Sequence, residues 1–221
     1  MTAAITPLRL EEVFKTSGIP THTFVKPQEY DRLLVALRTP GQGVVIEGPS
    51  GIGKTTAVTK VLEELGDYAT VTTLSARRPG DLSIIQQLTT SAEPLGTVII
   101  DDFHRLPQAD RERLTDLVKF LADKETSGTK LVLVGINKTG ESMITFMTDV
   151  ASRLEIIRFE ANPRSKVWQL VKQGEQAMSV AFTMSQRIVE AAHGSFYIAQ
   201  LLCREACLEA LVLRLNCRRE L

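Results

Sequence analysis

The stretch from Val44 to Thr55 reads Val-Val-Ile-Glu-Gly-Pro-Ser-Gly-Ile-Gly-Lys-Thr, and it decides how this chain folds. Its second part, Gly48–Thr55, matches the pattern Gly-x-x-x-x-Gly-Lys-[Ser/Thr], which is diagnostic where it joins a strand to a helix. Val44–Glu47, with its aliphatic residues, is the expected strand. The residues after the loop form one apolar stripe at helical spacing: Ala57, Val58, Val61, Leu62 and Leu65. The sequence therefore predicts a phosphate-binding loop between a buried strand and an amphipathic helix.

The loop offers several groups that bind phosphate oxygens. Its glycines let backbone N–H groups approach an anion closely, and the following helix directs its positive end at the same place. Lys54 adds a positive charge at the terminal phosphates, Thr55 offers a hydroxyl to Mg²⁺, and Thr56 can touch the α-phosphate. We expect nucleotide contacts from Gly48, Pro49, Ser50, Gly51, Ile52, Gly53, Lys54, Thr55 and Thr56. The alternative is a turn that is rich in glycine by chance.

A second motif is an apolar run that ends in two carboxylates, Val98-Ile99-Ile100-Asp101-Asp102. It matches the magnesium-aspartate motif known as Walker B, in which a buried strand delivers Asp101 to Mg²⁺ at its carboxyl end. Asp102 follows where many ATPases place the acid that polarises the attacking water. The alternative for Asp102 is a helix cap or a loop acid. Because aspartate is shorter than the more usual glutamate, we expect slow hydrolysis or a nucleotide switch.

Strands and helices alternate along the first part of the chain, which predicts an α/β fold with a parallel sheet and right-handed crossovers. Further strands are expected near residues 69–74, 97–101, 130–135 and 154–159, and further helices near 82–90 and 108–122. After Pro163 we expect three helices, near 164–178, 184–192 and 196–215, and no strand. The chain thus divides into a leader (1–27), an α/β core (28–160) and a helical lid subdomain (161–221).

Two further polar residues stand beside expected strands. The run Leu131–Asn137 is apolar almost to its end, so in a parallel sheet Asn137 would point toward the γ-phosphate and orient water. A turn-forming asparagine is the alternative. Arg153, which follows Ser152 before the last strand, could reach a phosphate on a neighbouring subunit. A solvated arginine or an ion pair within the chain explains Arg153 equally well.

These features together resemble the AAA+ and STAND ATPases over nearly the whole chain: Gly48–Thr55, Val98–Asp102, Asn137, Ser152-Arg153 and the helical tail. The resemblance implies a three-layer P-loop NTPase fold, with a five-stranded parallel sheet of order 5-1-4-3-2 and a helical lid. It also implies that Asn137 occupies the sensor 1 position and Arg153 the arginine-finger position. The leader segment Thr23–Val25, with Pro27, would line the adenine pocket. The sensor 2 arginine of many AAA+ lids has no counterpart in Gly194–Tyr197.

The composition is that of an ordinary soluble globular protein, with 43% hydrophobic residues and 26 basic residues balanced by 26 acidic ones. No overall field attracts DNA, so nucleic-acid binding is not favoured, although a local basic patch would allow it. The apolar runs are too short to cross a bilayer and the N-terminus has no secretory segment, so we expect a cytoplasmic protein without membrane contact. Cys203 and Cys207 are expected to be buried thiols rather than metal ligands.

The resemblance implies ATP or ADP with Mg²⁺ as ligands, and Mg²⁺-dependent ATP hydrolysis as the activity. Our first hypothesis is a STAND-like signalling module of a bacterial defence protein, in which ATP binding promotes homo-oligomerisation and activates a fused or associated effector domain. The second is an AAA+ DNA-associated regulator of transposition or replication type, with Arg77-Arg78, Lys124 and Lys138 as a basic patch. A small-molecule kinase or a GTPase is not supported, because Asn137-Lys138-Thr139-Gly140 lacks the acid of the guanine-recognition sequence.

Overall fold

The structure, a computed structural model, describes residues 8–66, 71–88, 94–123, 128–136 and 153–210, and the backbone of residues 219–220. It divides into two compact units. The sheet unit consists of Glu29–Ser50 and Ala57–Glu160, and the helical unit of Met1–Gln28, Gly51–Thr56 and Ala161–Leu221. Each unit has its own cluster of buried hydrophobic residues.

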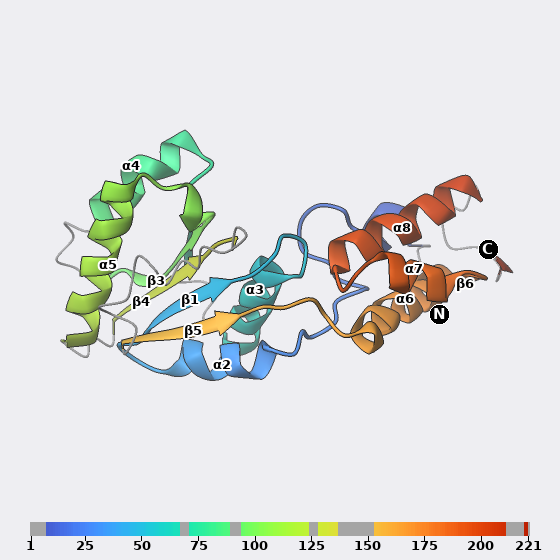
Figure 1. Cartoon of the computed structure of the whole chain (residues 1–221), viewed down its shortest axis with the longest axis horizontal. Coiled ribbons are helices and arrows are strands. Elements are labelled where there is room, and N and C mark those ends of the chain that lie inside the picture. The colour runs from blue at the N-terminus through green and yellow to red at the C-terminus, as the bar shows by residue number, and fades with distance from the viewer. Residues whose placement is uncertain are drawn as a thin grey trace, which may run out of the picture. The chain divides into compact units, whose positions relative to one another are not determined.

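A five-stranded parallel sheet forms the middle of the sheet unit (Figure 1). Its strands are β1 (Gly43–Glu47), β2 (Val71–Ser75), β3 (Gly96–Asp101), β4 (Thr129–Val134) and β5 (Leu154–Arg158). They lie in the order β2-β3-β4-β1-β5, and every neighbouring pair runs parallel. The predicted order 5-1-4-3-2, read from the other edge, is confirmed, and so is the three-layer P-loop NTPase fold.

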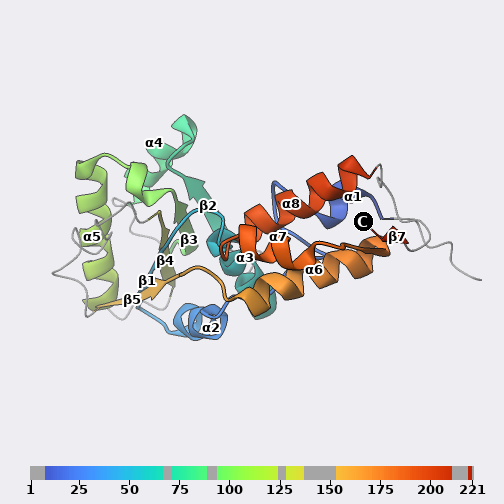
Figure 2. The same cartoon turned by 45° about the vertical axis from the view of Figure 1, so that its right-hand side comes forward.

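Helices cover the sheet on both sides, which is why its central strands are apolar on both faces. They are α2 (Tyr30–Arg38), α3 (Lys54–Leu65), α4 (Pro79–Leu88) and α5 (Gln108–Asp123). In both views α4 and α5 lie on one side of the sheet and α2 and α3 on the other (Figures 1 and 2). β1 is buried at every position, and its Val45 lies opposite Leu133 of β4 and Ile156 of β5. Such doubly covered strands have continuous apolar runs rather than alternating patterns.

The helical unit is built from α1 (Leu10–Val13), α6 (Arg164–Met178), α7 (Ser185–Ala191) and α8 (Phe196–Glu209). It also contains a short parallel pair, β6 (Val180–Ala181) with β7 (Arg219–Glu220). The expectation of no strand after Pro163 was therefore wrong. Strands of this length have no periodicity that a sequence pattern could reveal. The turn into β6 follows Ser179, which ends α6 in the left-handed conformation at φ 52°.

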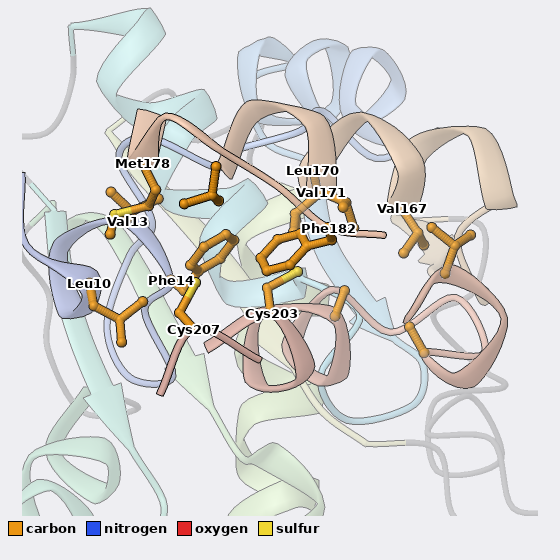
Figure 3. Packing of buried hydrophobic residues seen from close by; sticks show 14 of the residues in the cluster. Leu10, Val13, Phe14, Val167, Leu170, Val171, Met178, Phe182, Cys203 and Cys207 are labelled. Carbon is orange, nitrogen blue, oxygen red and sulfur yellow. The ribbon is translucent and has the colours of Figure 1, made fainter. Parts of the chain in front are cut away.

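The leader supplies part of the core of the helical unit (Figure 3). Phe14 packs against Phe182 with ring centroids 6.0 Å apart, within the range of favourable aromatic pairs. Leader and lid residues share this cluster, including Leu10, Val13, Leu170, Val171, Met178, Cys203 and Cys207. The prediction of buried thiols at Cys203 and Cys207 is confirmed, and burial raises the pKa of Cys207 to about 11. Leader and lid helices therefore pack together in one compact unit.

Within the part of the chain that the structure describes, none of the helices has the length and apolar character that crossing a bilayer requires.

The close approach of Phe14 to α6 predicts a large effect of a small substitution. A Cβ atom at Gly174 would lie 2.2 Å from Cε1 of Phe14, and a buried ring has no room to move aside. We expect Gly174→Ala to lower the free energy of unfolding by about 1–3 kcal/mol, the usual cost of overpacking. Gly80→Ala is the matched control, because Gly80 also lies in a helix but a Cβ there meets nothing within 4 Å. Urea unfolding of both variants measures the difference, and equal stabilities would contradict this packing.

Candidate functional site

The predicted phosphate-binding loop joins β1 to α3 in the order that the motif requires. β1 ends at Glu47 and α3 begins at Lys54. Gly51 and Gly53 have φ angles of 79° and 96°, in a region that residues with side chains rarely adopt. Lys54 is buried, whereas Thr55 is exposed at the first turn of α3. The glycines therefore make possible a backbone path that other residues would strain.

Gly51 and Ile52 are held by residues of the helical unit that the sequence did not identify. The Gly51 carbonyl oxygen accepts hydrogen bonds from the Tyr197 backbone N–H at 3.0 Å and from the Ser195 hydroxyl at 3.1 Å. The Asn162 side-chain amide donates to the Ile52 carbonyl oxygen at 3.2 Å. Ser195 could be predicted as the N-cap of α8, because serine is favoured at that position. Its hydrogen bond to the loop could not be predicted from any sequence pattern.

A pocket opens within the helical unit beside the loop. Its cavity volume is about 40 Å³, well below the roughly 300–1,000 Å³ usual for ligand pockets. Leader, loop and lid residues all contribute to its wall, and they are Pro20, Thr23, Phe24, Val25, Pro27, Gly53, Thr56, Leu170, Phe196 and Gln200. The leader segment expected at an adenine pocket thus lines a mainly apolar pocket next to the start of α3.

Asp101 lies in the sheet unit, at the carboxyl end of β3. The register of β2 and β3 places Ser75 opposite Asp101, so polar residues of two neighbouring strands meet at this edge. The Asp101 carboxylate accepts a hydrogen bond from the backbone N–H of Asp102 at 2.7 Å. Its side chain is partly exposed. A carboxylate at this edge is suited to a hard cation such as Mg²⁺.

Asp102 is buried and both of its carboxylate oxygens are engaged by Arg77. Nε of Arg77 lies 2.7 Å from Oδ2 of Asp102, and Nη2 lies 2.7 Å from Oδ1. The Ser75 hydroxyl also donates to Oδ2, at 3.3 Å. Asp102 has a φ of 57°, the left-handed conformation, so its backbone turns sharply away from β3. This two-point pairing is the strongest form of arginine–carboxylate contact, and no sequence pattern predicted it.

Asn137 and Ser152 lie outside the described residues. The preceding Ile136 is described, and its backbone N–H donates to Nδ1 of His104 at 3.2 Å. His104 belongs to the short 3-10 helix Phe103–Arg105, which follows Asp102 directly. The chain leading out of β4 is therefore tied to the segment that follows the two carboxylates.

Arg153 stands before β5, at the amino end of the strand, whereas Asp101 lies at the carboxyl end of the parallel strand β3. Its Nε lies 2.9 Å from Oδ1 of Asp123, at the end of α5. The Arg153 and Asp123 side chains are 38% and 58% exposed, so solvent weakens this ion pair. Within one chain, Arg153 thus forms the ion pair that was the alternative to an arginine finger.

Comparison with known families gives a match over most of the sheet unit. A sequence model of AAA, the ATPase family associated with various cellular activities, matches residues 44–161. The matched range contains the phosphate-binding loop, both carboxylates of the second motif, and Arg153.

Solved structures show the same fold. The chain is similar to the RuvB Holliday junction branch migration motor of Thermotoga maritima, with a TM-score of 0.62 and 22% identity, over 87% of this chain and 66% of that one. It is also similar to the Orc1 protein of Aeropyrum pernix in complex with DNA, with a TM-score of 0.65 and 15% identity, over 92% and 65% of the two chains. This chain spans about two thirds of the length of these proteins.

Proposed function

Since this chain belongs to the AAA family of ATPases, we propose that it binds ATP and ADP with Mg²⁺ and couples ATP binding or slow hydrolysis to oligomerisation and signalling. The observation that carries the proposal is the glycine-rich loop with Lys54 and Thr55 at the start of a helix. Backbone N–H groups in such a loop and the positive end of the helix both favour an anion.

Each residue of the loop has a proposed role toward the nucleotide. The backbone of residues 48–53 and the Lys54 ammonium bind the β- and γ-phosphates, and Thr56 touches the α-phosphate. Thr55 and Asp101 hold Mg²⁺, which usually takes one or two protein oxygens together with phosphate oxygens and water. The exposure of Thr55 and the partial exposure of Asp101 support this assignment.

The adenine base is proposed to bind at the pocket of the helical unit, which must widen to admit it because its cavity volume is about 40 Å³. The pocket is mainly apolar, and Gly53 and Thr56 form part of its wall. A base in this pocket would therefore be close to residues of the loop that binds the phosphates. The flat apolar ring of Phe196 on α8 suits contact with a purine. Leader residues also line the pocket and would contact the base as well.

Hydrolysis is proposed to be slow because Asp102 is held by Arg77. The Asp102 carboxylate already accepts from Arg77 at both oxygens and from Ser75 at one of them, which leaves little acceptor capacity for the attacking water. Asn137 is proposed to orient the same water. Arg153 is proposed to act on the nucleotide of a neighbouring subunit, since its exposed pair with Asp123 costs little to exchange.

In its cellular setting, the module is proposed to be a cytoplasmic part of a STAND-like bacterial defence protein, with leader (1–27), ATPase core (28–160) and lid (161–221). ATP-driven assembly would activate a fused or associated effector domain. Two features support a switch rather than a fast motor: the arginine clamp on Asp102, and the absence of an arginine in Gly194–Tyr197.

The second candidate function is a DNA-associated AAA+ regulator. Two proteins of the same fold favour it, because RuvB is named as a branch migration motor and Orc1 was solved in complex with DNA. The balance of 26 basic and 26 acidic residues gives this chain no general attraction for DNA, so a local patch would have to supply it.

Loss of the Lys54 charge should abolish nucleotide binding. We expect Lys54→Ala to weaken ATP affinity by about 100-fold or more, because a buried ammonium at the phosphates has no substitute. Lys60→Ala is the matched control, since Lys60 lies on the same helix and pairs with Glu63. Calorimetric titration with ATP and Mg²⁺ measures both. If Lys54→Ala binds ATP as the unchanged chain does, the assignment of the loop is wrong.

Release of Asp102 should accelerate hydrolysis. We expect Arg77→Ala to raise the ATP turnover rate several-fold, because it frees a carboxylate that both guanidinium contacts now hold. Adding Asp102→Asn should remove the gain. Arg78→Ala is the control, because the neighbouring Arg78 pairs with Asp81 instead. A slower Arg77→Ala enzyme with unchanged ATP affinity would mean that the arginine positions the acid rather than restraining it.

ATP should change the assembly state of the chain. We expect light scattering to show a higher mass with ATP and Mg²⁺ than with ADP, and Arg153→Ala to lower turnover per subunit without weakening ATP binding. An unchanged mass would remove the signalling proposal. The DNA-associated alternative predicts instead that the chain binds duplex DNA at low salt. The logarithm of the binding constant should then fall linearly with the logarithm of the salt concentration.

A further inference from the structure

Gln200 is a buried polar residue on the wall of the pocket. It lies on α8, one helical turn after Phe196, and it is only 3% exposed. Phe196, Thr23 and Gln200 line the pocket together with Gly53 and Thr56 of the loop. The pocket is otherwise mainly apolar, so Thr23 and Gln200 give one part of its wall a polar character.

The hydrogen bonds of Thr23 determine which way the Gln200 amide faces. The Thr23 hydroxyl lies 3.0 Å from the Val13 carbonyl oxygen, which can only accept, so the single hydroxyl proton points there. The Thr23 oxygen must then act as an acceptor toward Gln200. Only the amide nitrogen of Gln200 can donate, and it lies 2.7 Å from the Thr23 oxygen. The nitrogen is thus fixed on Thr23, and the carbonyl oxygen faces the other way.

That carbonyl oxygen, Oε1 of Gln200, is buried and accepts no hydrogen bond from the described residues. Buried acceptors in native proteins almost always have a partner, which is a protein group, a water or a ligand. The hydrogen bonds from Thr23 to Val13 and from Gln200 to Thr23 hold the amide in this orientation, so the amide cannot rotate to pair Oε1 with Thr23. Oε1 of Gln200 therefore lacks a hydrogen-bond donor that a ligand could supply.

We propose that Gln200 is the residue that selects the base, with Oε1 accepting a hydrogen bond from the 6-amino group of adenine. The inference rests on the proposed function, since it requires a nucleotide in this pocket. Adenine presents a donor at position 6, whereas guanine and hypoxanthine present an acceptor oxygen there. With guanine or hypoxanthine bound, the 6-oxygen of the base and Oε1 of Gln200 would face each other as two buried acceptors without a donor. Sites built around a hydrogen bond reject such analogues strongly.

The placement of the loop fits this orientation of the base. The ribose is attached on the five-membered ring of a purine, and the 6-position lies on the six-membered ring. With the phosphates bound at the loop, the 6-position is carried away from Gly53 and Thr56 into the pocket. The cavity volume of about 40 Å³ is smaller than a purine, and Oε1 is buried, so the entering base must widen the pocket and open the contacts that cover this atom.

The test compares ATP with inosine triphosphate, which carries an oxygen in place of the 6-amino group. We expect the unchanged chain to bind ATP about 10- to 100-fold more tightly, the effect of one buried hydrogen bond. Gln200→Met, which keeps the length of the side chain and removes the acceptor, should bring the ratio of the two affinities close to one. Gln176→Met, an exposed substitution on α6, should leave the ratio unchanged.

A second variant tests the orientation of the amide without changing Gln200. Thr23→Val removes the hydroxyl that fixes the amide nitrogen, so the amide can turn and present its donor to the oxygen of hypoxanthine. We expect this variant to bind inosine triphosphate more tightly than the unchanged chain does, and to lose most of its preference for ATP. Because each ratio is measured within one protein, partial unfolding of a variant cancels, and Thr23→Val decides the matter if Gln200→Met does not fold.

The outcomes separate the inference from the proposed function. If the unchanged chain binds neither nucleotide, the proposed function fails and the role of Gln200 fails with it. If it binds both equally, or if Gln200→Met and Thr23→Val keep the full preference for ATP, the chain is a nucleotide-binding protein whose base is selected elsewhere. A preference that falls in both variants and persists in Gln176→Met supports Gln200 as the specificity-determining residue.

Discussion

The structure of the candidate site depends on one backbone constraint, the positive φ angles of Gly51 and Gly53 in the loop after β1. A side chain at either position would be strained, and it would also crowd residues at the start of α8. A Cβ at Gly51 would lie 2.8 Å from Oγ of Ser195, and one at Gly53 would lie 3.2 Å from the Phe196 ring. Glycine at these two positions serves two purposes: it adopts the positive φ angles of the loop, and it leaves room for the start of α8. Gly53 and Phe196, which approach each other here, are both part of the pocket wall.

Much of the fold could be predicted because its signals are local. The apolar run of β1 and the motif that follows are readable from adjacent residues, and resemblance to a known family supplied the strand order. The contacts that define the site are of another kind. Arg77 and Asp102 are 25 positions apart, and Thr23 and Gln200 are 177 positions apart. No spacing rule connects such residues, since the fold alone brings them together, and the two-residue strands β6 and β7 were missed because they are too short to have a pattern.

Buried acids in the sheet unit share a common arrangement, in which an exposed arginine neutralises an almost inaccessible carboxylate. The Glu47 side chain is 1% exposed and its partner Arg158 is 62% exposed, while Asp102 and Arg77 are 11% and 54% exposed. Removing the arginine would leave a buried charge without a partner, which is costly. The arginine itself stays in water, so the cost of separating such a pair falls on the buried acid. The acid therefore stays in place, and the arginine would leave only where another cation or hydrogen-bond donor takes over the carboxylate.

The helical unit offers a route by which a bound nucleotide could affect the lid. Leader, loop and α8 are far apart in the sequence, but all three line the pocket, and Phe14, Thr23 and Gln200 join leader to lid inside the same core. A ligand that contacts all three segments stabilises the folded arrangement of the unit according to its affinity and concentration. ATP and ADP can produce different states only if their affinities for those states differ. In the proposed function the base contacts are common to both nucleotides, so a difference between ATP and ADP would come from the γ-phosphate at the loop. The Gly51 bonds to Ser195 and Tyr197 connect that loop directly to the start of α8.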